Sequence, residues 1–338
     1  MSFWRGQQVL VTGGAGFIGS NLVDALVAAG SQVTVLDDLS VGKRDNVNPA
    51  ARLVEGSILD RAMVGELVTS ASVVFHLAVA CLRVCFDRPH HVHDVNATGT
   101  LNLLQEIQDR NSGLKRFVYV SSSEVYGTAI EAPMTEEHPL NPTTVYGASK
   151  LAGELYTQAY FRTYAMPTVI ARPFNTYGYR EHHEGASGEV IPRFMVRIVN
   201  DMAPVIFGDG EQTRDFTFVS DTVAGLMKAA ECEALVGDCV NIARGEEVTI
   251  RRIGELLLQI TGRNDLVIQK EDPRPADVLR HYANVGKAER LLGFRAPVGI
   301  EAGLQLYVDW FRKNHQDHSG LLAQMQDRNW LLKETATP

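Results

Sequence analysis

The chain has 338 residues, of which 45% are hydrophobic and 21% charged, a balance typical of a globular protein with one large or two small domains. Its net charge of −8, without a lysine- or arginine-rich block, argues against nucleic acid or an anionic membrane as a partner. The sequence has no signal-peptide pattern, no apolar run that could span a bilayer and no zinc-type pairing of its four cysteines. We therefore expect a cytoplasmic, reduced protein without a metal.

The first pattern in the chain is a short apolar strand that runs into a glycine-rich turn. The strand is predicted over 8–12, the letters GGAGFIG follow, and a helix is predicted over 17–29. In this setting Gly13 allows a tight turn, Gly16 lets the backbone approach a pyrophosphate, and Gly19 lets the helix pack closely. The pattern predicts a dinucleotide-binding turn with the helix N-terminus facing the phosphates.

The next predicted strand, over 32–36, ends at an acidic residue. Asp37 is placed to accept hydrogen bonds from an adenosine ribose and to repel a 2′-phosphate, so the pattern favours NAD over NADP. Lys43 and Arg44 follow in the next loop and weaken that preference, because a nearby cation can accommodate a 2′-phosphate.

Strands and helices continue to alternate through the first half. Strands predicted over 52–55, 73–77 and 114–121 alternate with helices over 60–69 and 91–109. Such apolar strands are typical of a parallel sheet with helices on both faces. We expect an α/β protein with a Rossmann-type, doubly wound parallel sheet that binds ligands at the carboxyl ends of its strands. The residues expected to bind the cofactor at this edge are Gly13, Gly16, Phe17, Ile18, Gly19, Asp37, Ser57, Ile58, Leu77 and Ala78.

A group of polar residues follows the strand that ends at 121. The letters SSSE at 121–124 supply three hydroxyls and a carboxylate, and Tyr146 and Lys150 are spaced so that they share one face of a helix. A phenol has an unperturbed pKa of about 10, and a cation beside it lowers that pKa toward the range in which a general base works. On these letters alone, YGASK as an ordinary helix start remains an open alternative.

The second half of the chain is less regular. The polar segment 178–188 is predicted to be a loop over the ligand, and its histidines His182 and His183 are interpreted as solvated or substrate-touching side chains, not metal ligands. Arg214, at a strand start facing a glycine-rich loop, suits bidentate binding of a diphosphate. Helices are predicted over 145–165, 190–200, 220–230, 284–292 and 300–314, and strands over 168–171, 205–207 and 214–219. The predicted domains are 1–173 and a smaller, partly interleaved substrate domain over 174–315, followed by a tail over 316–338.

Seven short motifs follow one another along the chain: TGGAGFIG at 12–19, HLA at 76–78, Asn96 with Gly99-Thr100, SSSEVYG at 121–127, YGASK at 146–150, RPFNTYG at 172–178 and TRDFTFVSD at 213–221. In this order they resemble the extended short-chain dehydrogenase/reductase family, in its branch of NAD-dependent nucleotide-sugar epimerases and dehydratases. The resemblance covers nearly the whole chain and implies an NAD-dependent enzyme. One segment, 79–88, is a residue shorter than usual for the family, so no sugar contact is assigned to Arg83 or Cys85.

The resemblance also implies roles for single residues. Tyr146 is expected to be the base that acts on a sugar hydroxyl, Lys150 to hold the nicotinamide ribose, and Ser122 to be the catalytic hydroxyl. The other residues implied to bind ligands are Pro173 beside the nicotinamide, and Asn175, Val190, Arg214, Arg274 and Asp277 on the substrate side. By the same resemblance we expect a UDP-sugar or other nucleotide-diphosphate sugar as substrate, and a homodimer that pairs through the helices over 91–109 and 145–165.

The choice of reaction depends on Glu124. The shared oxidation at carbon 4 of the sugar gives a 4-keto intermediate, which can be reduced on its other face, lose water from carbons 5 and 6, or, as a uronate, lose carbon dioxide. By resemblance, dehydratases and decarboxylases have a glutamate at this position, where it serves as a base at carbon 5, and Ser123 stands where one dehydratase group has an aspartic acid. We expect a 4,6-dehydratase. The alternatives are a 4-epimerase for UDP-glucose or UDP-N-acetylglucosamine, a UDP-glucuronate decarboxylase, and a non-catalytic NAD-binding protein.

Overall fold

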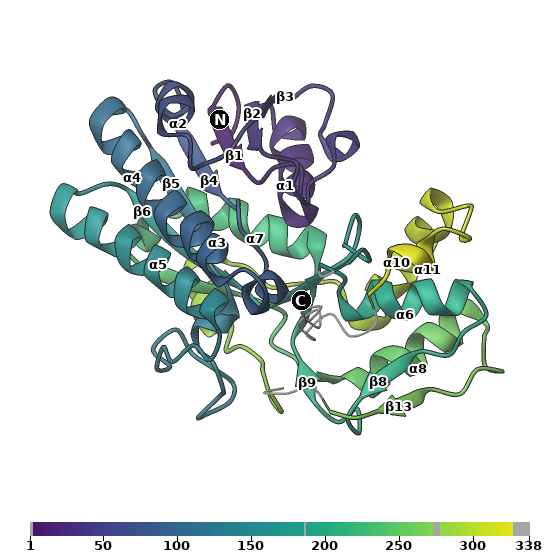
Figure 1. Cartoon of the computed structure of the whole chain (residues 1–338). Helices are drawn as coiled ribbons and strands as arrows, with labels where there is room; N and C mark the ends of the chain where they lie inside the picture. Colours follow the sequence, from purple (N-terminus) through teal and green to yellow (C-terminus); the bar gives the residue numbers. More distant parts are fainter. Residues whose placement is uncertain (1–2, 186, 274–277, 327–338) are drawn as a thin grey trace, which may run out of the picture.

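A parallel sheet forms the centre of the molecule. The computed structural model describes residues 3–185, 187–273 and 278–326. Seven strands lie in the order β11-β6-β5-β4-β1-β2-β3, and every neighbouring pair is parallel (Figure 1). The strands are β1 (Gln8–Thr12), β2 (Gln32–Asp37), β3 (Arg52–Glu55), β4 (Val73–His76), β5 (Arg116–Val120), β6 (Thr168–Pro173) and β11 (Cys239–Ile242). The order reverses between β1 and β4, which confirms the expected Rossmann-type, doubly wound fold.

Helices cover both faces of this sheet (Figure 1). One face carries α2 (Arg61–Val68), α4 (Gly99–Arg110) and α5 (Val145–Tyr164), whose apolar side chains share one core cluster with the sheet. The other face carries α1 (Phe17–Ala28) and α7 (Val219–Glu231), which share a second cluster with it. Because β4 and β5 are covered from both sides, every residue in them is buried, and this burial explains their continuous apolar runs.

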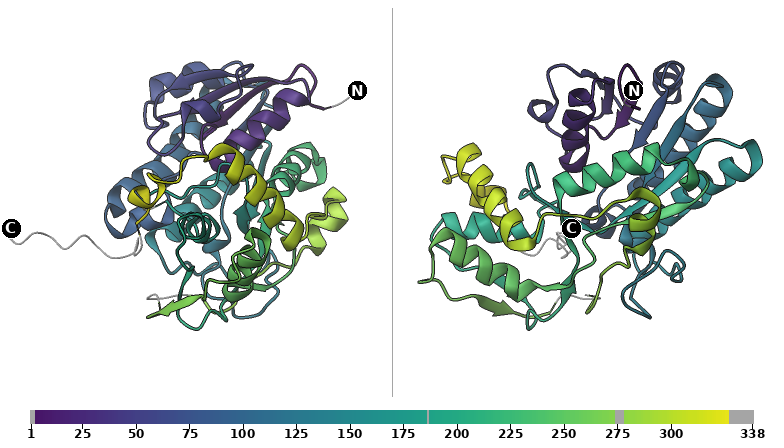
Figure 2. Two further views of the ribbon diagram at one scale, coloured as in Figure 1. Left: turned by 90° about the vertical axis from the view of Figure 1, so that its right-hand side faces the viewer. Right: turned by 180° about the vertical axis from the view of Figure 1, so that it is seen from behind.

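The second half of the chain builds a smaller unit, shown in green and yellow beside the purple and blue first half in Figure 2. Its helices α6 (Val190–Val199), α8 (Ile250–Thr261), α10 (Ile300–Asn314) and α11 (Leu321–Gln324) enclose a separate apolar core. Its strands pair in twos: β7 (Asn175–Tyr177) with β10 (Phe216–Phe218), β8 (Val205–Phe207) with β13 (Gln269–Glu271), and β9 (Thr213–Arg214) with β12 (Val248–Thr249).

The two halves interleave. β6 ends at Pro173 and β7 begins at Asn175, where the sequence divides the domains, yet α7 and β11 come later in the chain and return to the sheet. Helix α9 (Gly286–Leu292) also packs into the core of the sheet through Ala288. The domain division at 173 therefore stays a prediction.

Two predicted elements are interrupted. The helix expected over 91–109 consists of α3 (Pro89–His93), a π-helical turn (Asp94–Thr98) and α4. The strand expected over 214–219 breaks at Asp215, so that β9 and β10 pair with different partners. Contacts with distant segments of the chain cause this break. The buried carboxylate of Asp215 accepts hydrogen bonds from the backbone N–H groups of Arg244, Gly245 and Ala283 at 3.1, 2.9 and 3.2 Å.

The predicted tail over 316–338 is described as far as Gln326. Within it, Leu321 of α11 packs into the core of the smaller unit. Among the helices described in the structure, none has the length and apolar character needed to cross a membrane.

Candidate active site

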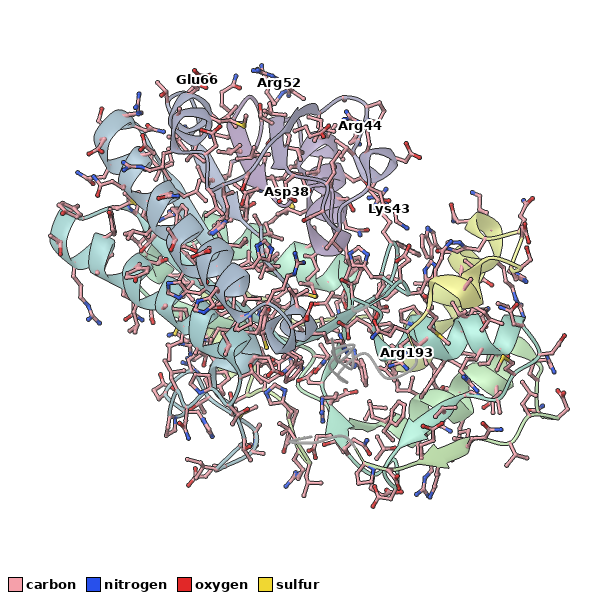
Figure 3. The ribbon with its side chains drawn as sticks, in the orientation of Figure 1. Asp38, Lys43, Arg44, Arg52, Glu66 and Arg193 are labelled. Carbon is pink, nitrogen blue, oxygen red and sulfur yellow. The ribbon has the colours of Figure 1, made fainter. Side chains whose placement is uncertain are left out.

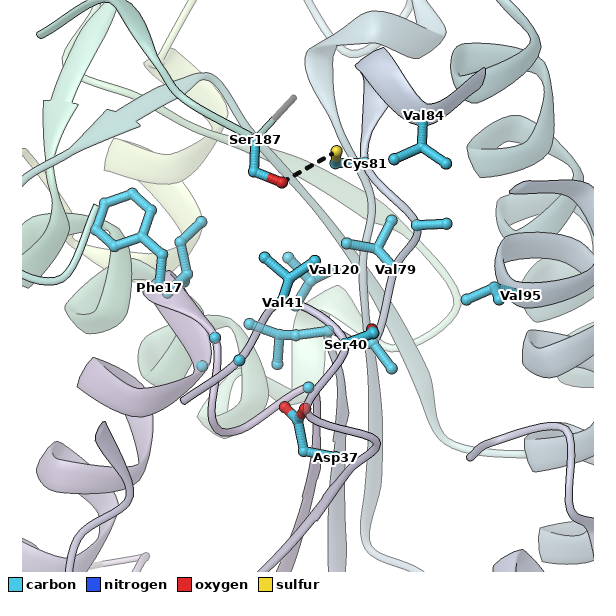
Figure 4. A pocket seen from close by; sticks show the side chains of 18 of the residues that line it. Phe17, Asp37, Ser40, Val41, Val79, Cys81, Val84, Val95, Val120 and Ser187 are labelled. Carbon is cyan, nitrogen blue, oxygen red and sulfur yellow. Dashed lines mark hydrogen bonds between the residues drawn. The ribbon is translucent and has the colours of Figure 1, made fainter. Parts of the chain in front are cut away.

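A cavity of about 410 Å³ opens at the carboxyl ends of the central strands (Figure 4). The predicted site residues that line it are Gly13, Gly16, Phe17, Ile18, Gly19, Asp37, Ser57, Ile58, Leu77, Ala78, Ser122, Tyr146, Lys150, Pro173 and Asn175. Of the other predicted residues, Ser123, Glu124, Val190 and Arg214 do not line it, and Arg274 and Asp277 lie outside the described residues. The fold thus brings the cofactor-side residues together, whereas among the described substrate-side residues Asn175 lines the cavity and Val190 and Arg214 do not.

The glycine turn forms the floor of this cavity. Gly13 has a φ of 72°, and a Cβ added to it would lie 2.6 Å from the backbone nitrogen of Ala78. A Cβ on Gly19 would lie 2.1 Å from the carbonyl oxygen of Gly13, so only glycine lets α1 start this close to the turn. At the N-cap of α1, Gly16 provides no side-chain cap, which leaves the first N–H groups of the helix available to a phosphate.

Asp37 lies at one end of the cavity (Figure 4). Its Oδ2 accepts a hydrogen bond from the backbone N–H of Ala15, and its Oδ1 accepts one from Leu39, both at 2.9 Å. Burial raises the pKa of the Asp37 carboxyl, and these two hydrogen bonds oppose the rise. The carboxylate therefore orders the turn and the following loop while it faces the cavity.

The two nearby cations are engaged by carboxylates. Lys43 forms an ion pair with Glu184, and Arg44 forms one with Glu55. Figure 3 shows Arg44 at the edge of the first half and Lys43 on the side that faces the second half. Neither cation lines the cavity, whereas Asp37 and Asp38 both do, so this end of the site suits the unphosphorylated ribose of NAD.

Lys150 is held inside the protein by the helix that carries it. Thr144 caps this helix, α5, by accepting a hydrogen bond from the backbone N–H of Gly147 at 3.0 Å. Lys150 Nζ donates to the carbonyl oxygen of Val120 at 2.7 Å and lies 4.4 Å from the centre of the Tyr119 ring. Burial lowers the pKa of Lys150 to about 7, and the negative charge of Glu154 opposes that fall.

Tyr146 faces the cavity one turn earlier on α5. Burial raises the pKa of its phenol above the usual value, a hydrogen bond with Ser122 opposes the rise, and the charge of Glu124 adds to it. The pKa of Tyr146 is therefore raised, and not lowered as expected from a cation beside the phenol, because burial dominates and the Lys150 ammonium group donates to Val120. Ser122 is confirmed as a neighbour of the phenol, while its part in catalysis stays a prediction.

Glu124 and Ser123 stand behind Ser122 on a 3₁₀ turn (Ser123–Val125). The backbone N–H of Glu124 donates to Ser122 Oγ at 3.2 Å, which orients the hydroxyl. The backbone of Ser123 is hydrogen-bonded to the buried side chain of His281. Although Glu124 does not line the cavity, its charge acts on both Tyr146 and Arg83, so its carboxylate lies near the reaction centre.

Among the substrate-side predictions, Asn175 lies in the cavity wall and Arg214 is oriented differently. Arg214 Nη1 donates to the carbonyl oxygens of Thr213 and Val278 at 2.8 and 2.7 Å. The diphosphate role assigned to Arg214 is untested and stays a prediction.

His182, interpreted from the sequence as a solvated or substrate-touching side chain, lines the cavity. Several polar lining residues were not identified from the sequence, among them Cys81, Ser187 and Glu189. They come from the segment after β4 and from the loop before α6, and no motif marks them. Ser121 also lines the cavity, and its place in SSSEVYG offered a signal. Within the described part of the chain, Ser121 Oγ and Asn175 Oδ1 are buried without a hydrogen-bond partner.

These features fit a dinucleotide. Buried polar atoms without partners in a cavity wall indicate a ligand with hydrogen-bonding groups. The uncapped N-terminus of α1 fits the phosphates, Asp37 fits a ribose, and Lys150 fits a second ribose near the reaction centre. When bound, NAD supplies the group that accepts and returns a hydride.

Comparison with known proteins agrees with this site. A family model described as the NAD dependent epimerase/dehydratase family matches residues 9–243. The chain is 35% identical to a putative UDP-glucose 4-epimerase of Methanocaldococcus jannaschii, over 91% of this chain and 99% of that protein. It is similar to the solved UDP-glucose 4-epimerase of Thermotoga maritima with UDP-glucose, at 34% identity, 91% and 99% coverage and a TM-score of 0.87. It is also similar to a dTDP-glucose 4,6-dehydratase of Streptomyces venezuelae with NAD bound, at 32% identity, 91% and 98% coverage and a TM-score of 0.85.

The family match covers well over half of the chain, and both the relative and the solved structures extend over nearly all of it. This chain therefore belongs to the NAD-dependent epimerase/dehydratase family and is an NAD-dependent enzyme that modifies nucleotide sugars.

Proposed function

We propose that the protein is a UDP-hexose 4-epimerase. The observation that supports this reaction is that Tyr146, Ser122 and Lys150 line the cavity, whereas Glu124 does not. Epimerisation at carbon 4 needs one proton acceptor and no second base at carbon 5. The similarity to UDP-glucose 4-epimerases, one of them solved with UDP-glucose, supports UDP as the nucleotide and a hexose as the sugar.

In this reaction Tyr146 takes the proton of the hydroxyl at carbon 4 as the sugar is oxidised, and it returns the proton when the 4-keto sugar is reduced on its other face. Ser122 donates a hydrogen bond at the same oxygen and holds the sugar against the phenol. Lys150 sets the position of the ribose. Burial raises the pKa of Tyr146 and the hydrogen bond with Ser122 opposes that rise, so Ser122 assists the phenol in proton transfer.

A 4,6-dehydratase is the second candidate, and Glu124 is the observation that favours it. Its negative charge raises the pKa of Tyr146, and a carboxylate near the reaction centre can serve as the base at carbon 5 of a bound sugar. The sequence alone favours the dehydratase. We propose the epimerase instead because Glu124 stands behind Ser122 and does not line the cavity.

Product analysis in deuterated water distinguishes the two reactions. We expect the purified enzyme with NAD to convert UDP-glucose or UDP-N-acetylglucosamine to the carbon-4 epimer, without deuterium at carbon 5. A 4-keto-6-deoxy product labelled at carbon 5 would contradict the epimerase and establish the dehydratase. In the same assay Glu124→Gln should retain epimerisation within about tenfold, whereas a dehydratase should lose elimination by at least about a hundredfold.

We further propose that two copies pair through α4 and α5, as the resemblance implies. Several apolar side chains are exposed there: Leu101 on α4, and Val145, Leu155 and Tyr164 on α5. Sedimentation of the wild type and of Leu155→Glu tests this. The wild type should sediment as a dimer, and a variant that remains dimeric would exclude this face.

A further inference from the structure

One ion pair lies at the cavity, with its carboxylate in the cavity wall. Arg83 lies on the 3₁₀ turn Leu82–Phe86 that follows β4, and Glu189 is the N-cap residue of α6. Two parallel hydrogen bonds join them, from Nη1 to Oε1 at 3.0 Å and from Nη2 to Oε2 at 3.3 Å. The Arg83 side chain is 13% exposed and the Glu189 side chain 46%. Of the two residues, Glu189 lines the cavity and Arg83 does not.

The same two segments meet at a second point. Cys81 Sγ lies 3.6 Å from Ser187 Oγ, and both side chains line the cavity (Figure 4). The segment after β4 and the loop before α6 therefore face each other with polar groups in register. Glu189 also lies at the positive end of the α6 dipole, which stabilises its negative charge.

Glu189 acts on the reaction centre. Its negative charge raises the pKa of Tyr146, and it raises the pKa of Arg83, which keeps that guanidinium charged. Arg83 itself does not line the cavity, and the described arginine that does, Arg88, is exposed, so water screens its charge. Among the residues that the structure describes, Glu189 is therefore the glutamate that both lines the cavity and acts on Tyr146.

We propose that Glu189, held in place by Arg83, is a specificity-determining residue that selects neutral hexoses over uronates. An ionised carboxylate only accepts hydrogen bonds, so it pairs with a sugar hydroxyl and repels a carboxylate at carbon 6. The inference rests on the proposed function, because it takes the bound sugar to lie between Tyr146 and Glu189. It adds a substrate class, since it predicts that UDP-glucuronate is a poor substrate.

The test compares UDP-glucose with UDP-glucuronate, which differ only at carbon 6. Dissociation constants are measured by calorimetry on the NAD-loaded enzyme. The wild type should bind UDP-glucose at least about tenfold more tightly, the effect of one hydrogen bond to a charged group. Glu189→Gln should tighten the binding of UDP-glucuronate by about tenfold relative to that of UDP-glucose. The substitution removes the negative charge from the cavity wall, while the positive charges of its partner Arg83 and of the N-terminus of α6 remain.

Two variants serve as controls. Glu189→Asp keeps the charge and should keep the selectivity. Glu301→Gln removes one carboxylate from an exposed pair with Arg252, which lies away from the cavity, and should change neither constant. NAD content and melting temperature show that each variant is folded and loaded.

The outcomes separate this inference from the proposed function. Equal or tighter binding of UDP-glucuronate by the wild type, or an unchanged ratio in Glu189→Gln, would overturn the role of Glu189 whatever reaction the enzyme catalyses. A normal preference for UDP-glucose together with a product other than the carbon-4 epimer would overturn the epimerase proposal and leave the selectivity standing.

Discussion

Asn96 Nδ2 donates a hydrogen bond to Ser149 Oγ at 3.0 Å and so joins the turn before α4 to the helix that carries Tyr146. The same side chain clamps Ala80, accepting from its N–H at 2.8 Å and donating to its carbonyl oxygen at 3.1 Å. Ser149 in turn donates to the carbonyl oxygen of Tyr146 at 2.7 Å. One buried amide thus fixes the cavity wall and the base relative to each other.

We predict that Asn96→Ala destabilises the protein by about 2–4 kcal/mol and lowers kcat by about tenfold or more, because it leaves the buried polar groups of Ala80 unpaired and loosens the base. Chemical denaturation and steady-state kinetics measure the two effects. Asn102→Ala is the matched control, since Asn102 lies on α4 and makes one longer hydrogen bond, to Ile58 at 3.3 Å. Equal effects of the two substitutions would refute the clamp.

Tyr146→Phe should reduce turnover at least about a hundredfold, because the phenol is the group in the described cavity lining that is hydrogen-bonded to Ser122. NAD should stay bound, since the phenyl ring keeps the packing. Product formation and the NAD content of the purified variant are measured. Tyr156→Phe on the same helix should behave as the wild type, and substantial turnover by Tyr146→Phe would remove Tyr146 from the role of base.

The buried Lys150 predicts a pH-dependent stability. Its pKa falls from 10.5 in the unfolded chain to about 7 in the folded protein. Between these values the unfolded chain binds a proton that the folded protein does not, so this group makes stability rise with pH, by about 1.4 kcal/mol per pH unit within the window.

Lys150→Met should abolish that dependence. The free energy of unfolding of the variant should exceed that of the wild type most below pH 7. This difference should shrink as the pH rises toward 10.5. Chemical denaturation at several pH values below and inside this window tests the prediction, with the exposed Lys115→Met as the control. A gain that does not change with pH would mean that Lys150 stays charged in the folded state.

The ion pair of Arg172 and Glu154 lies beneath the site and is almost fully buried, with side chains 2% and 0% exposed and two hydrogen bonds of 2.9 and 2.7 Å. Glu154→Gln should cost about 3–5 kcal/mol, because it leaves a buried guanidinium without its counter-charge. Glu301→Gln, which breaks an exposed pair, should cost less than about 1 kcal/mol. Thermal denaturation measures the stability of both variants. Similar losses of stability would contradict the claim that burial makes the Arg172–Glu154 pair more important than the exposed pair.

Local patterns were sufficient to predict most of the fold. The strands expected over 8–12 and 52–55 and the helix expected over 300–314 have the same bounds in the structure. Apolar runs and glycine turns depend on neighbours in the chain, so the sequence predicts them well. Asp215 breaks a predicted strand because its carboxylate is bound by segments far along the chain, which no local pattern records.

The sequence by itself determined the glycine turn, Asp37, and the Tyr146 and Lys150 pair on one helix face, because each of these depends on spacing within a single motif. Only the tertiary structure decided which partners the charged side chains have. Lys150 donates to Val120, Glu124 stands behind Ser122, and Glu189 pairs with Arg83, which is 106 residues away in the chain. Burial and partners from distant segments set these directions and the pKa values that follow from them. The chemistry common to the family is therefore carried by local motifs, and the choice of reaction and sugar depends on contacts that form only when the chain folds.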